Sequence, residues 1–475
     1  MAEEQSAYIK KVSKFREEVF DRAAARHEGG VWLKASLKDI RRLVVIASAP
    51  RSGSSLLFAA MRMFPEVYAL SGEEVPFYKL NGLSSDAFPS DEVPPGFKPS
   101  WKGGEAFSRD ILGDMSFDAN PADILKDPLQ REQYTDDLVL RFSMQWPAVD
   151  FSYEGFKRLA NNALSAHLAG QKGFDKEVFH LELIKALRTV HNEIDPFYYD
   201  IPEDMVRAAF PGLARPSNPP NDVLMIEEPP FILLKPARKA TEHDLASKTL
   251  VLKSTVNSYK MDFIRELFPN AGISVIYLTR NPGASINGLY DGWLHRGFFS
   301  HNLRAFSDLP TSPPSQGGDV GRSDFRGLGI KGYSDIREYG KWWWKYDLPP
   351  GWREYSGKRL EEVCAFQWRA SNTAILKHLA NAKPGCLRLK CEDIIRDSES
   401  RLVALKTVEG FLGFESGSAS NAVLGGFPVV QATEPPERFR WMKKKDMLMP
   451  ALEDAAVAGL ASELGYSGER HDNWL

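Results

Sequence analysis

Small hydroxyl residues, a glycine and an arginine lie together between residues 50 and 57, which read Pro-Arg-Ser-Gly-Ser-Ser-Leu-Leu. At the start of a helix, free backbone N–H groups bind anions, and Arg51 with Ser52, Gly53, Ser54 and Ser55 adds donors for phosphate oxygens. The ATP-binding version of such a loop ends in Gly-Lys-Ser/Thr, and this segment has no lysine. We therefore predict a phosphate-binding loop that does not serve ATP, with a simple serine cap of the helix as the alternative.

A second candidate anion site is Arg280 with Ser285. An apolar run over 273–278 predicts a strand that brings Arg280 to the carboxyl end of the sheet, where ligands of open α/β sheets gather. Pro282 is typical of the first turn of a helix, and Ser285 follows one turn in. The alternative is an arginine paired with a surface carboxylate. Two anion sites on one sheet indicate a ligand with phosphate groups at two separated positions.

The elements that must position these residues alternate between apolar runs and helical patterns, which predicts an α/β fold with a mainly parallel sheet flanked by helices. The strands are expected at 43–48, 67–70, 249–252, 273–278 and 386–391. We predict three parts: an N-terminal helical segment, with one or two exposed helices, over 1–40; an α/β core over 41–82 and 246–475; and a mostly helical insertion over 83–245, as an acceptor-specificity region.

Composition narrows the function classes. The 475 residues carry a formal net charge of −3, which argues against a partner that needs a strongly basic protein, such as nucleic acid. The three cysteines lack metal-ligand spacing, so no metal is expected. No apolar run is long enough for a membrane span, and no signal peptide is recognisable, so we expect a cytoplasmic protein without membrane contact. The oligomeric state is not defined by the sequence.

The two anion motifs resemble those of sulfotransferases that use 3′-phosphoadenosine 5′-phosphosulfate (PAPS). Residues 50–57 resemble the family's 5′-phosphosulfate loop, and Arg280-Asn281-Pro282 resembles its 3′-phosphate motif. Residues 387–394 are similar to its strand ending in Tyr-Glu-Asp-Leu. The resemblance covers about half the chain, over 41–80 and 248–415. It implies a P-loop-like core, PAPS as co-substrate, adenosine 3′,5′-bisphosphate as product, and no metal.

One position departs from this pattern. The family usually has a serine eight residues after the motif's arginine, and here that residue is Gly288. Ser285 is a candidate substitute because it lies one helical turn earlier, on a neighbouring face.

The resemblance also implies catalytic residues. Gly72-Glu73-Glu74 is similar to the Gly-Glu-Glu of tyrosylprotein sulfotransferases, whose second glutamate is the general base, so we assign that role to Glu74. Lys253, at the end of a strand, resembles a catalytic lysine of the family. With Arg51 it would stabilise charge on the leaving group. A solvated acidic pair and a solvated strand-end lysine are the alternatives.

A late basic cluster follows residue 436. By resemblance to the loop that closes over the nucleotide in the family, Arg438 and Arg440 are candidate 3′-phosphate ligands, and Trp441 is a candidate adenine or hinge contact. A solvated basic turn is the alternative. The run Trp342–Trp344 could line an acceptor pocket, although core packing is the default explanation.

The sequence therefore predicts a sulfotransferase that moves a sulfuryl group from PAPS to an alcohol or phenol by in-line displacement. A small-molecule acceptor is expected because no anchor for the secretory route is recognisable. A P-loop kinase or other phosphotransferase is one alternative, disfavoured by the missing loop lysine. A non-catalytic nucleotide-binding protein on the same fold is the other.

Overall fold

A computed structural model describes residues 2–26, 30–84, 88–94, 104–170, 173–305, 327–336, 340–382, 385–415, 417–420 and 437–466. Its central element is a seven-stranded sheet in the order β4-β3-β2-β5-β1-β6-β9. The strands are β1 (Arg42–Ala47), β2 (Val67–Ala69), β3 (Ser116–Phe117), β4 (Arg238–Lys239), β5 (Thr249–Lys253), β6 (Gly272–Thr279) and β9 (Gly385–Lys390). The five strands from β2 to β9 are parallel to one another, and β3 runs antiparallel to both of its neighbours, β2 and β4. The prediction of a mainly parallel sheet is confirmed.

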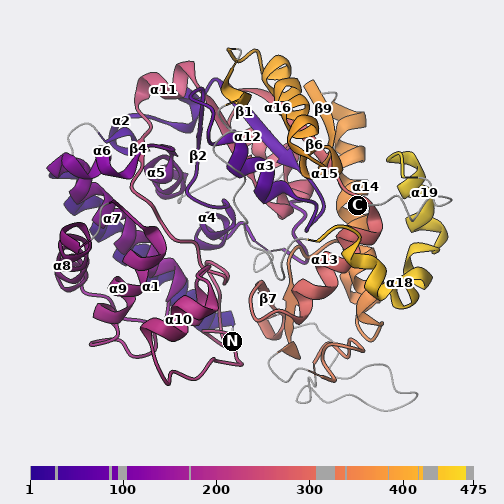
Figure 1. The fold of residues 1–475 in the computed structure, drawn as a ribbon, viewed down its shortest axis with the longest axis horizontal. Coiled ribbons are helices and arrows are strands. Elements are labelled where there is room, and N and C mark those ends of the chain that lie inside the picture. The colour runs from indigo at the N-terminus through magenta and orange to yellow at the C-terminus, as the bar shows by residue number, and fades with distance from the viewer. Residues whose placement is uncertain are drawn as a thin grey trace.

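Side chains of β1 alternate between two apolar cores, one on each face of the sheet. Leu43, Val45 and Ala47 point into the larger core. Val44 and Ile46 point into a core with α3 (Ser54–Met61) and α16 (Ser398–Leu412). Figure 1 shows the sheet between these helices and those on its other face. The helices that contribute to the larger core include α4 (Val75–Leu80), α5 (Gly104–Asp114), α12 (Met261–Leu267), α13 (Pro282–Leu294), α14 (Leu360–Ala382), α18 (Lys445–Leu452) and α19 (Ala455–Glu463).

The segment predicted as an insertion has an apolar core of its own. Most of its helices gather on one side of the molecule (Figure 1). Besides α5, its described α-helices are α6 (Pro121–Lys126), α7 (Pro128–Gln145), α8 (Tyr153–Gly170), α9 (Lys176–Leu187) and α10 (Glu203–Ala209), with α11 (Glu242–Ser247) leading back into β5. It also supplies β3 and β4, which extend the sheet beyond β2. The insertion is thus continuous with the sheet, and the proposed domain limits stay a prediction.

The N-terminal segment forms α1 (Ala2–Ala24) and α2 (Val31–Lys34). The expectation of exposed helices is wrong for one face of α1, because Val12, Val19 and Phe20 are buried. Val19 belongs to the core of the insertion, and Arg16 makes a buried ion pair with Asp110 of α5. Lys and Arg residues on the opposite face made the segment look wholly solvated in sequence.

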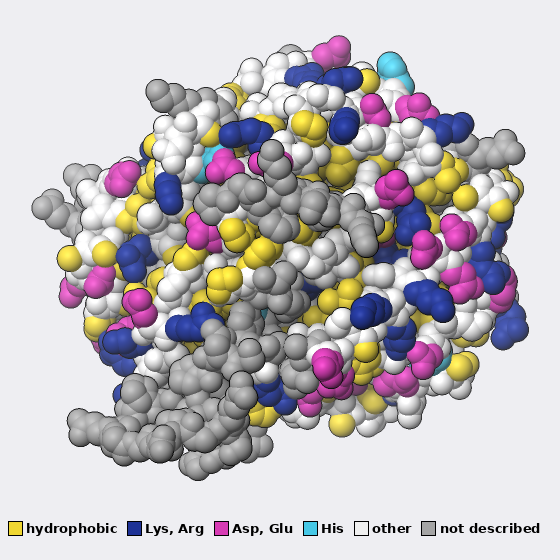
Figure 2. All heavy atoms as spheres, turned by 180° about the vertical axis from the view of Figure 1, so that it is seen from behind, with side chains coloured by type: hydrophobic (Ala, Val, Ile, Leu, Met, Phe, Trp, Pro, Cys, Tyr) yellow, Lys and Arg dark blue, Asp and Glu magenta, His cyan; other side chains and the backbone are white. Residues whose placement is uncertain are grey.

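After α13, β7 (Phe299–Asn302) pairs with β8 (Trp343–Lys345) in a two-stranded antiparallel sheet. Trp343 and Trp344 are fully buried, which agrees with the default explanation of core packing for this tryptophan run. Within the described residues, no helix has both the length and the apolar character needed to cross a bilayer. On the face shown in Figure 2, the basic and acidic side chains of the described residues are interspersed.

Candidate functional site

The predicted strand–loop–helix unit is confirmed: β1 is followed by a loop over 48–53 and then by α3. Two residues of this loop have left-handed backbone, Arg51 with φ +62° and Gly53 with φ +89°. Such turns direct successive N–H groups toward one point and make anion-binding concavities. Ser52 and Ser54 are buried at the same place. We call the segment 51–55 the cradle.

Gly53 is required by its surroundings as well as by its φ. A Cβ built on Gly53 would lie 2.4 Å from the Cys391 Sγ, closer than any real carbon approaches. Cys391 is the first residue of α15 (Cys391–Ile395) and is itself buried. The loop therefore packs tightly against the residue that follows β9, and this contact restricts its shape.

Arg280 and Ser285 reach the cradle from the neighbouring strand and helix. The Arg280 Nη1 donates to the Arg51 carbonyl oxygen at 3.0 Å across 229 residues of sequence. The Ser52 and Ser285 hydroxyl oxygens lie 3.4 Å apart, and both residues are almost fully buried. The two predicted anion motifs thus lie side by side.

Glu392 holds the segment that carries Arg280. One of its carboxylate oxygens accepts from the Asn281 backbone N–H at 2.9 Å and from the Asn281 Nδ2 at 2.8 Å. Asn281 in turn caps α13 by accepting from the Ala284 N–H at 2.7 Å. Tyr466 donates to the other Glu392 oxygen at 3.0 Å. The acidic residue after β9 is a structural anchor for Arg280.

The structure explains the glycine at position 288. A Cβ on Gly288 would lie 3.1 Å from the Arg51 Cβ and 3.7 Å from its Cγ, because the Arg51 side chain lies across α13 at this point. The Arg51 guanidinium carbon is 5.5 Å from the centre of the Phe298 ring. A serine here would compete with Arg51 for space. Ser285, not residue 288, is the hydroxyl that reaches Ser52.

Glu74 follows β2 and stands directly before α4, with 1% of its surface exposed. Among the described residues, neither carboxylate oxygen has a hydrogen-bond partner. Burial raises the pKa of Glu74 from 4.5 to about 7, an effect opposed by Asn257 and Lys253 and reinforced by Glu73. A carboxyl group that titrates near neutral pH suits proton transfer, since a general base works best with a pKa near the working pH.

The adjacent Glu73 has a different environment. It is partly exposed and makes an ion pair with the buried Lys253 at the end of β5. Lys253 lies opposite Ile46 of β1 in the parallel ladder, so it reaches the same sheet edge as the cradle. The alternative of a solvated acidic pair is excluded for Glu74 and that of a solvated lysine is excluded for Lys253, which is 5% exposed.

The loop that carries both glutamates is held by the insertion. The Ser71 N–H donates to an Asp114 carboxylate oxygen at 2.9 Å. Asp114 pairs with Arg141 of α7 at 3.0 Å, and Arg141 pairs with Glu227 at 2.9 Å. The Arg141 side chain is only 2% exposed. These residues were absent from the sequence prediction because no local pattern links them.

The late basic residues lie along α13 and α15. Arg440 pairs with Asp291 at 3.0 Å, and Arg438 donates to the Arg396 carbonyl oxygen. Trp441 is buried against Gly283 in the first turn of α13, where a Cβ on the glycine would lie 2.8 Å from the indole ring. The roles of Arg438, Arg440 and Trp441 toward a nucleotide stay predictions.

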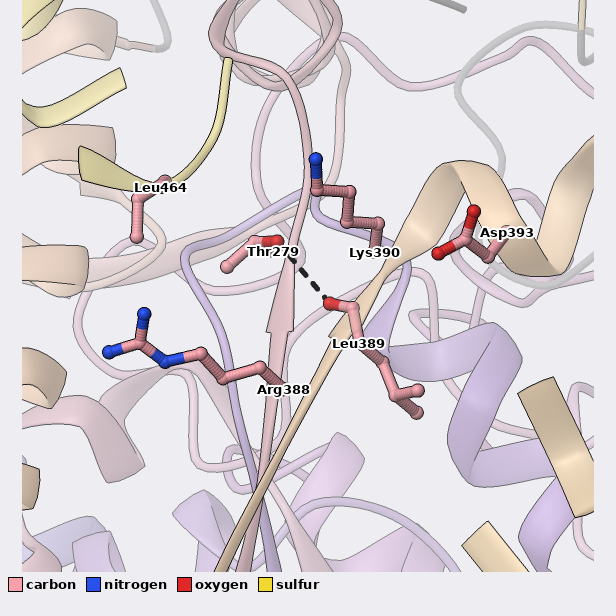
Figure 3. Close-up of a pocket in the computed structure, with 6 residues that line it drawn as sticks. All are labelled: Thr279, Arg388, Leu389, Lys390, Asp393 and Leu464. Carbon is pink, nitrogen blue, oxygen red and sulfur yellow. Dashed lines mark hydrogen bonds between the residues drawn. The ribbon is translucent and has the colours of Figure 1, made fainter. Parts of the chain in front are cut away.

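A hollow lies beside the Arg280 segment, at the carboxyl ends of β6 and β9 (Figure 3). Its lining residues are Thr279, Arg388, Leu389, Lys390, Asp393 and Leu464. The Thr279 hydroxyl donates to the Leu389 carbonyl oxygen at 3.3 Å and joins the two strands beneath it. The hollow does not include Glu74 or the cradle, so it is separate from the predicted reaction centre.

The sequence prediction missed Asn257, which is fully buried and influences Glu74. Its position four residues after Lys253 is the signal that could have found it. In the part of the chain that the structure describes, no group of three or more His, Cys, Asp or Glu side chains could hold a metal ion. The three cysteines are free thiols.

No family model matches this chain, and no curated protein sequence matches it. Solved structures that match include the sulfotransferase domain of the Synechococcus PCC 7002 olefin synthase, with 14% identity, a TM-score of 0.34, and coverage of 90% of this chain and 96% of that one. The sulfotransferase domain of the curacin biosynthetic pathway matches with 12% identity, a TM-score of 0.34, and coverage of 90% and 98%. Sulfotransferase STF9 from Mycobacterium avium matches with 12% identity, a TM-score of 0.35, and coverage of 96% and 83%. Likenesses this distant carry no conclusion on function.

Proposed function

We propose that this protein is a sulfotransferase that moves a sulfuryl group from PAPS to the hydroxyl of a small-molecule alcohol or phenol. The observation that carries the proposal is the junction of the two anion motifs. Arg280 contacts the cradle through the Arg51 carbonyl, and Ser285 faces Ser52. A single ligand with phosphate groups at two separated positions, as PAPS has, would match one surface assembled from both motifs.

The Arg280 side chain supports this proposal. One of its guanidinium nitrogens, Nη1, is bonded to the cradle, whereas its Nε is buried with no hydrogen-bond partner among the described residues. Buried donors are rarely left without an acceptor, and a guanidinium presents several donors in a planar fork suited to phosphate. In the proposed complex, Arg280 and Ser285 hold the 3′-phosphate, and the cradle holds the 5′-phosphosulfate.

The chemistry then needs a base and a cationic environment for the leaving group. Glu74 would take the proton of the acceptor hydroxyl. The acceptor oxygen would form a bond to sulfur as the bridging S–O bond breaks, and the bonding electrons would leave with adenosine 3′,5′-bisphosphate. Arg51, Lys253 and the cradle amides would stabilise the charge that develops on the departing phosphate. The buried location of Glu74 supports its role, since burial tunes its pKa upward.

Calorimetric titration with adenosine 3′,5′-bisphosphate, adenosine 5′-monophosphate and ATP tests the nucleotide part. Charge-assisted hydrogen bonds contribute about 1.5–3 kcal/mol each, so we expect the bisphosphate to bind about 10- to 100-fold more tightly than the monophosphate. Arg280→Ala should remove this preference. Arg265→Ala, on the exposed face of α12, is the matched control and should leave it unchanged.

Tight binding of ATP without binding of the bisphosphate would overturn the proposal in favour of a phosphotransferase. The acceptor part is tested by following transfer of ³⁵S-sulfate from labelled PAPS to a panel of alcohols and phenols. Binding of the bisphosphate with no transfer to any acceptor would indicate a nucleotide-binding protein without this activity.

A further inference from the structure

Asn257 has a polar side chain in the protein interior, where polar groups normally have hydrogen-bond partners. It lies in the short 3₁₀ helix η3 (Thr255–Tyr259), four residues beyond Lys253, with none of its surface exposed. Neither its amide nitrogen nor its amide oxygen has a hydrogen-bond partner within the described residues. Native proteins leave few buried polar groups without partners, and those that occur often belong to functional sites.

The group that Asn257 faces is equally unsatisfied. Its amide lies near enough to Glu74 to oppose the effect of burial on that carboxyl group, although the two side chains do not meet hydrogen-bond geometry. A primary amide offers two N–H donors, and an ionised carboxylate only accepts. The amide N–H and the carboxylate are therefore complementary, and a small movement of either side chain would bring the Asn257 Nδ2 onto one Glu74 oxygen.

Glu74 has other charged and titratable neighbours. Lys253 forms an ion pair with Glu73, which adds a second negative charge close to Glu74. Tyr78 on α4 also interacts with Glu74, and burial holds the pKa of its phenol well above the ordinary value, so the phenol stays neutral. The Asn257 amide does not titrate, so its donation is independent of pH.

The backbone around Asn257 is fixed on both sides. The Ser258 hydroxyl donates to the Ser48 carbonyl oxygen at 3.3 Å, which ties η3 to the start of the loop that carries the cradle. The Tyr259 hydroxyl donates to an Asp347 carboxylate oxygen at 2.7 Å. A rigid η3 can therefore keep the Asn257 amide at a set place relative to both Glu74 and the cradle.

We propose that Asn257 is a positioning residue that donates its amide N–H to one Glu74 oxygen and so aims the other oxygen at the acceptor hydroxyl. This inference rests on the proposed function and assigns a residue that the family resemblance does not supply. The donated hydrogen bond favours the ionised carboxylate, which is the form that can take the proton. The proton moves from the acceptor oxygen to Glu74, and Asn257 neither gains nor loses one.

The test measures the pKa of Glu74 in the full-length protein by ¹³C NMR of δ-labelled glutamate, with Glu74→Gln to assign the signal. Asn257→Leu keeps the side-chain size and removes the donor. We expect the Glu74 pKa to rise by about one pH unit, the equivalent of one lost hydrogen bond. The acidic limb of the kcat/KM profile for sulfate transfer should move upward by the same amount.

Two further variants make the outcome decisive. Asn257→Ser retains a shorter donor and should give an intermediate shift, and it also serves if the leucine variant does not fold. Asn372→Leu is the matched control: it removes another buried amide, which is bonded to Tyr277 and Trp368, and should leave the Glu74 pKa unchanged.

An unchanged Glu74 pKa in a folded Asn257 variant would overturn the inference, even if sulfate transfer is observed. A shifted pKa in a protein that transfers no sulfate would overturn the proposed function but leave the coupling between Asn257 and Glu74 established. A drop in kcat without movement of the pH profile would indicate a purely structural role and would also overturn the inference.

Discussion

Two loops at one edge of the sheet differ in how their shape is fixed. The loop after β1 is shaped by its own backbone, with left-handed residues at Arg51 and Gly53 and a close fit onto Cys391. The loop after β2, over 70–74, has no such turn and is held from outside by Asp114 and the insertion. The first loop is shaped by local contacts and by its own backbone, whereas the second depends on contacts between distant segments.

The two loops also differ in the chemical groups that they offer to a ligand. The cradle offers N–H groups, hydroxyls and a guanidinium, all of which favour negative charge. The second loop presents Glu74, a carboxyl group that burial keeps partly protonated near neutral pH. Glu73, one residue earlier, forms an ion pair with Lys253. In the proposed complex, the two loops would supply the anion site and the base from segments that are shaped independently.

The sharpest way to separate the two loops is Glu74→Gln, which removes the proposed base and leaves the cradle intact. Loss of a general base costs about 10²- to 10⁴-fold in rate, so we expect sulfate transfer to fall by that factor. Affinity for adenosine 3′,5′-bisphosphate should stay within twofold of the parent value. Radiometric transfer and calorimetry measure the two quantities. Full turnover in the variant would remove Glu74 as the base while leaving nucleotide binding unaffected.

Arg141→Met tests whether the insertion holds the second loop. It leaves the Asp114 and Glu227 carboxylates without their cation, and breaking a buried pair in this way costs about 3–5 kcal/mol of stability. Urea unfolding measures the loss. Arg22→Met is the control, because its pairs with Glu18 and Glu154 are exposed and such pairs contribute about 0–1 kcal/mol. Equal losses of stability in the two variants would contradict the expectation that Arg141 holds the loop over 70–74.

The pH dependence of stability reports on Glu74 without any ligand. Its pKa is raised from 4.5 to about 7 in the folded state, so between these values the folded protein binds more protons and stability falls as pH rises. At about 1.4 kcal/mol per pH unit, the penalty reaches about 3 kcal/mol above pH 7. Glu74→Gln removes it. The difference in unfolding free energy between variant and parent should therefore grow by about that amount from pH 4.5 to pH 7.5, and a constant difference would contradict the burial effect.

Gly53→Ala breaks the cradle and spares Glu74. A left-handed residue with a Cβ costs about 1–2 kcal/mol, and the contact with the Cys391 Sγ adds a packing cost of about 1–3 kcal/mol. We expect unfolding at lower urea and weaker binding of the bisphosphate. The double variant Gly53→Ala/Cys391→Ala should recover the packing part and retain the backbone part. Additive losses would show that the close approach to Cys391 carries no energy.

Much of the cradle could be predicted from sequence because its determinants are contiguous. The apolar run before Ser48 and the serines before Leu56 define a strand, a loop and a helix in order. Glu74 could be named from its motif, but its burial could not, since the residues that interact with it include some from β5 and η3. Arg141 and Asp114 have no local pattern, because the residues that they contact lie tens of residues away. The two strands of the insertion were missed because each is only two residues long.

Gly288→Ala tests the cradle through the space that Arg51 occupies, and it should give the smallest effect of these substitutions. In a helix interior, alanine is favoured over glycine by about 0.5–1 kcal/mol. Here the new methyl group would lie 3.1 Å from the Arg51 Cβ, so the Arg51 side chain must shift. We therefore expect little net change in stability but a several-fold loss of affinity for the bisphosphate.

Gly410→Ala is the control for this variant, because that position on α16 has no atom within 4 Å of a new Cβ. It should gain the full helical preference and leave binding unchanged. Equal stabilisation by the two substitutions, with unchanged affinity in both, would show that Arg51 does not depend on the space above Gly288. The family serine could then be restored at position 288 without cost. A loss of affinity confined to Gly288→Ala would instead tie the glycine to the placement of Arg51, and would explain why the hydroxyl facing Ser52 comes from Ser285, one turn earlier on α13.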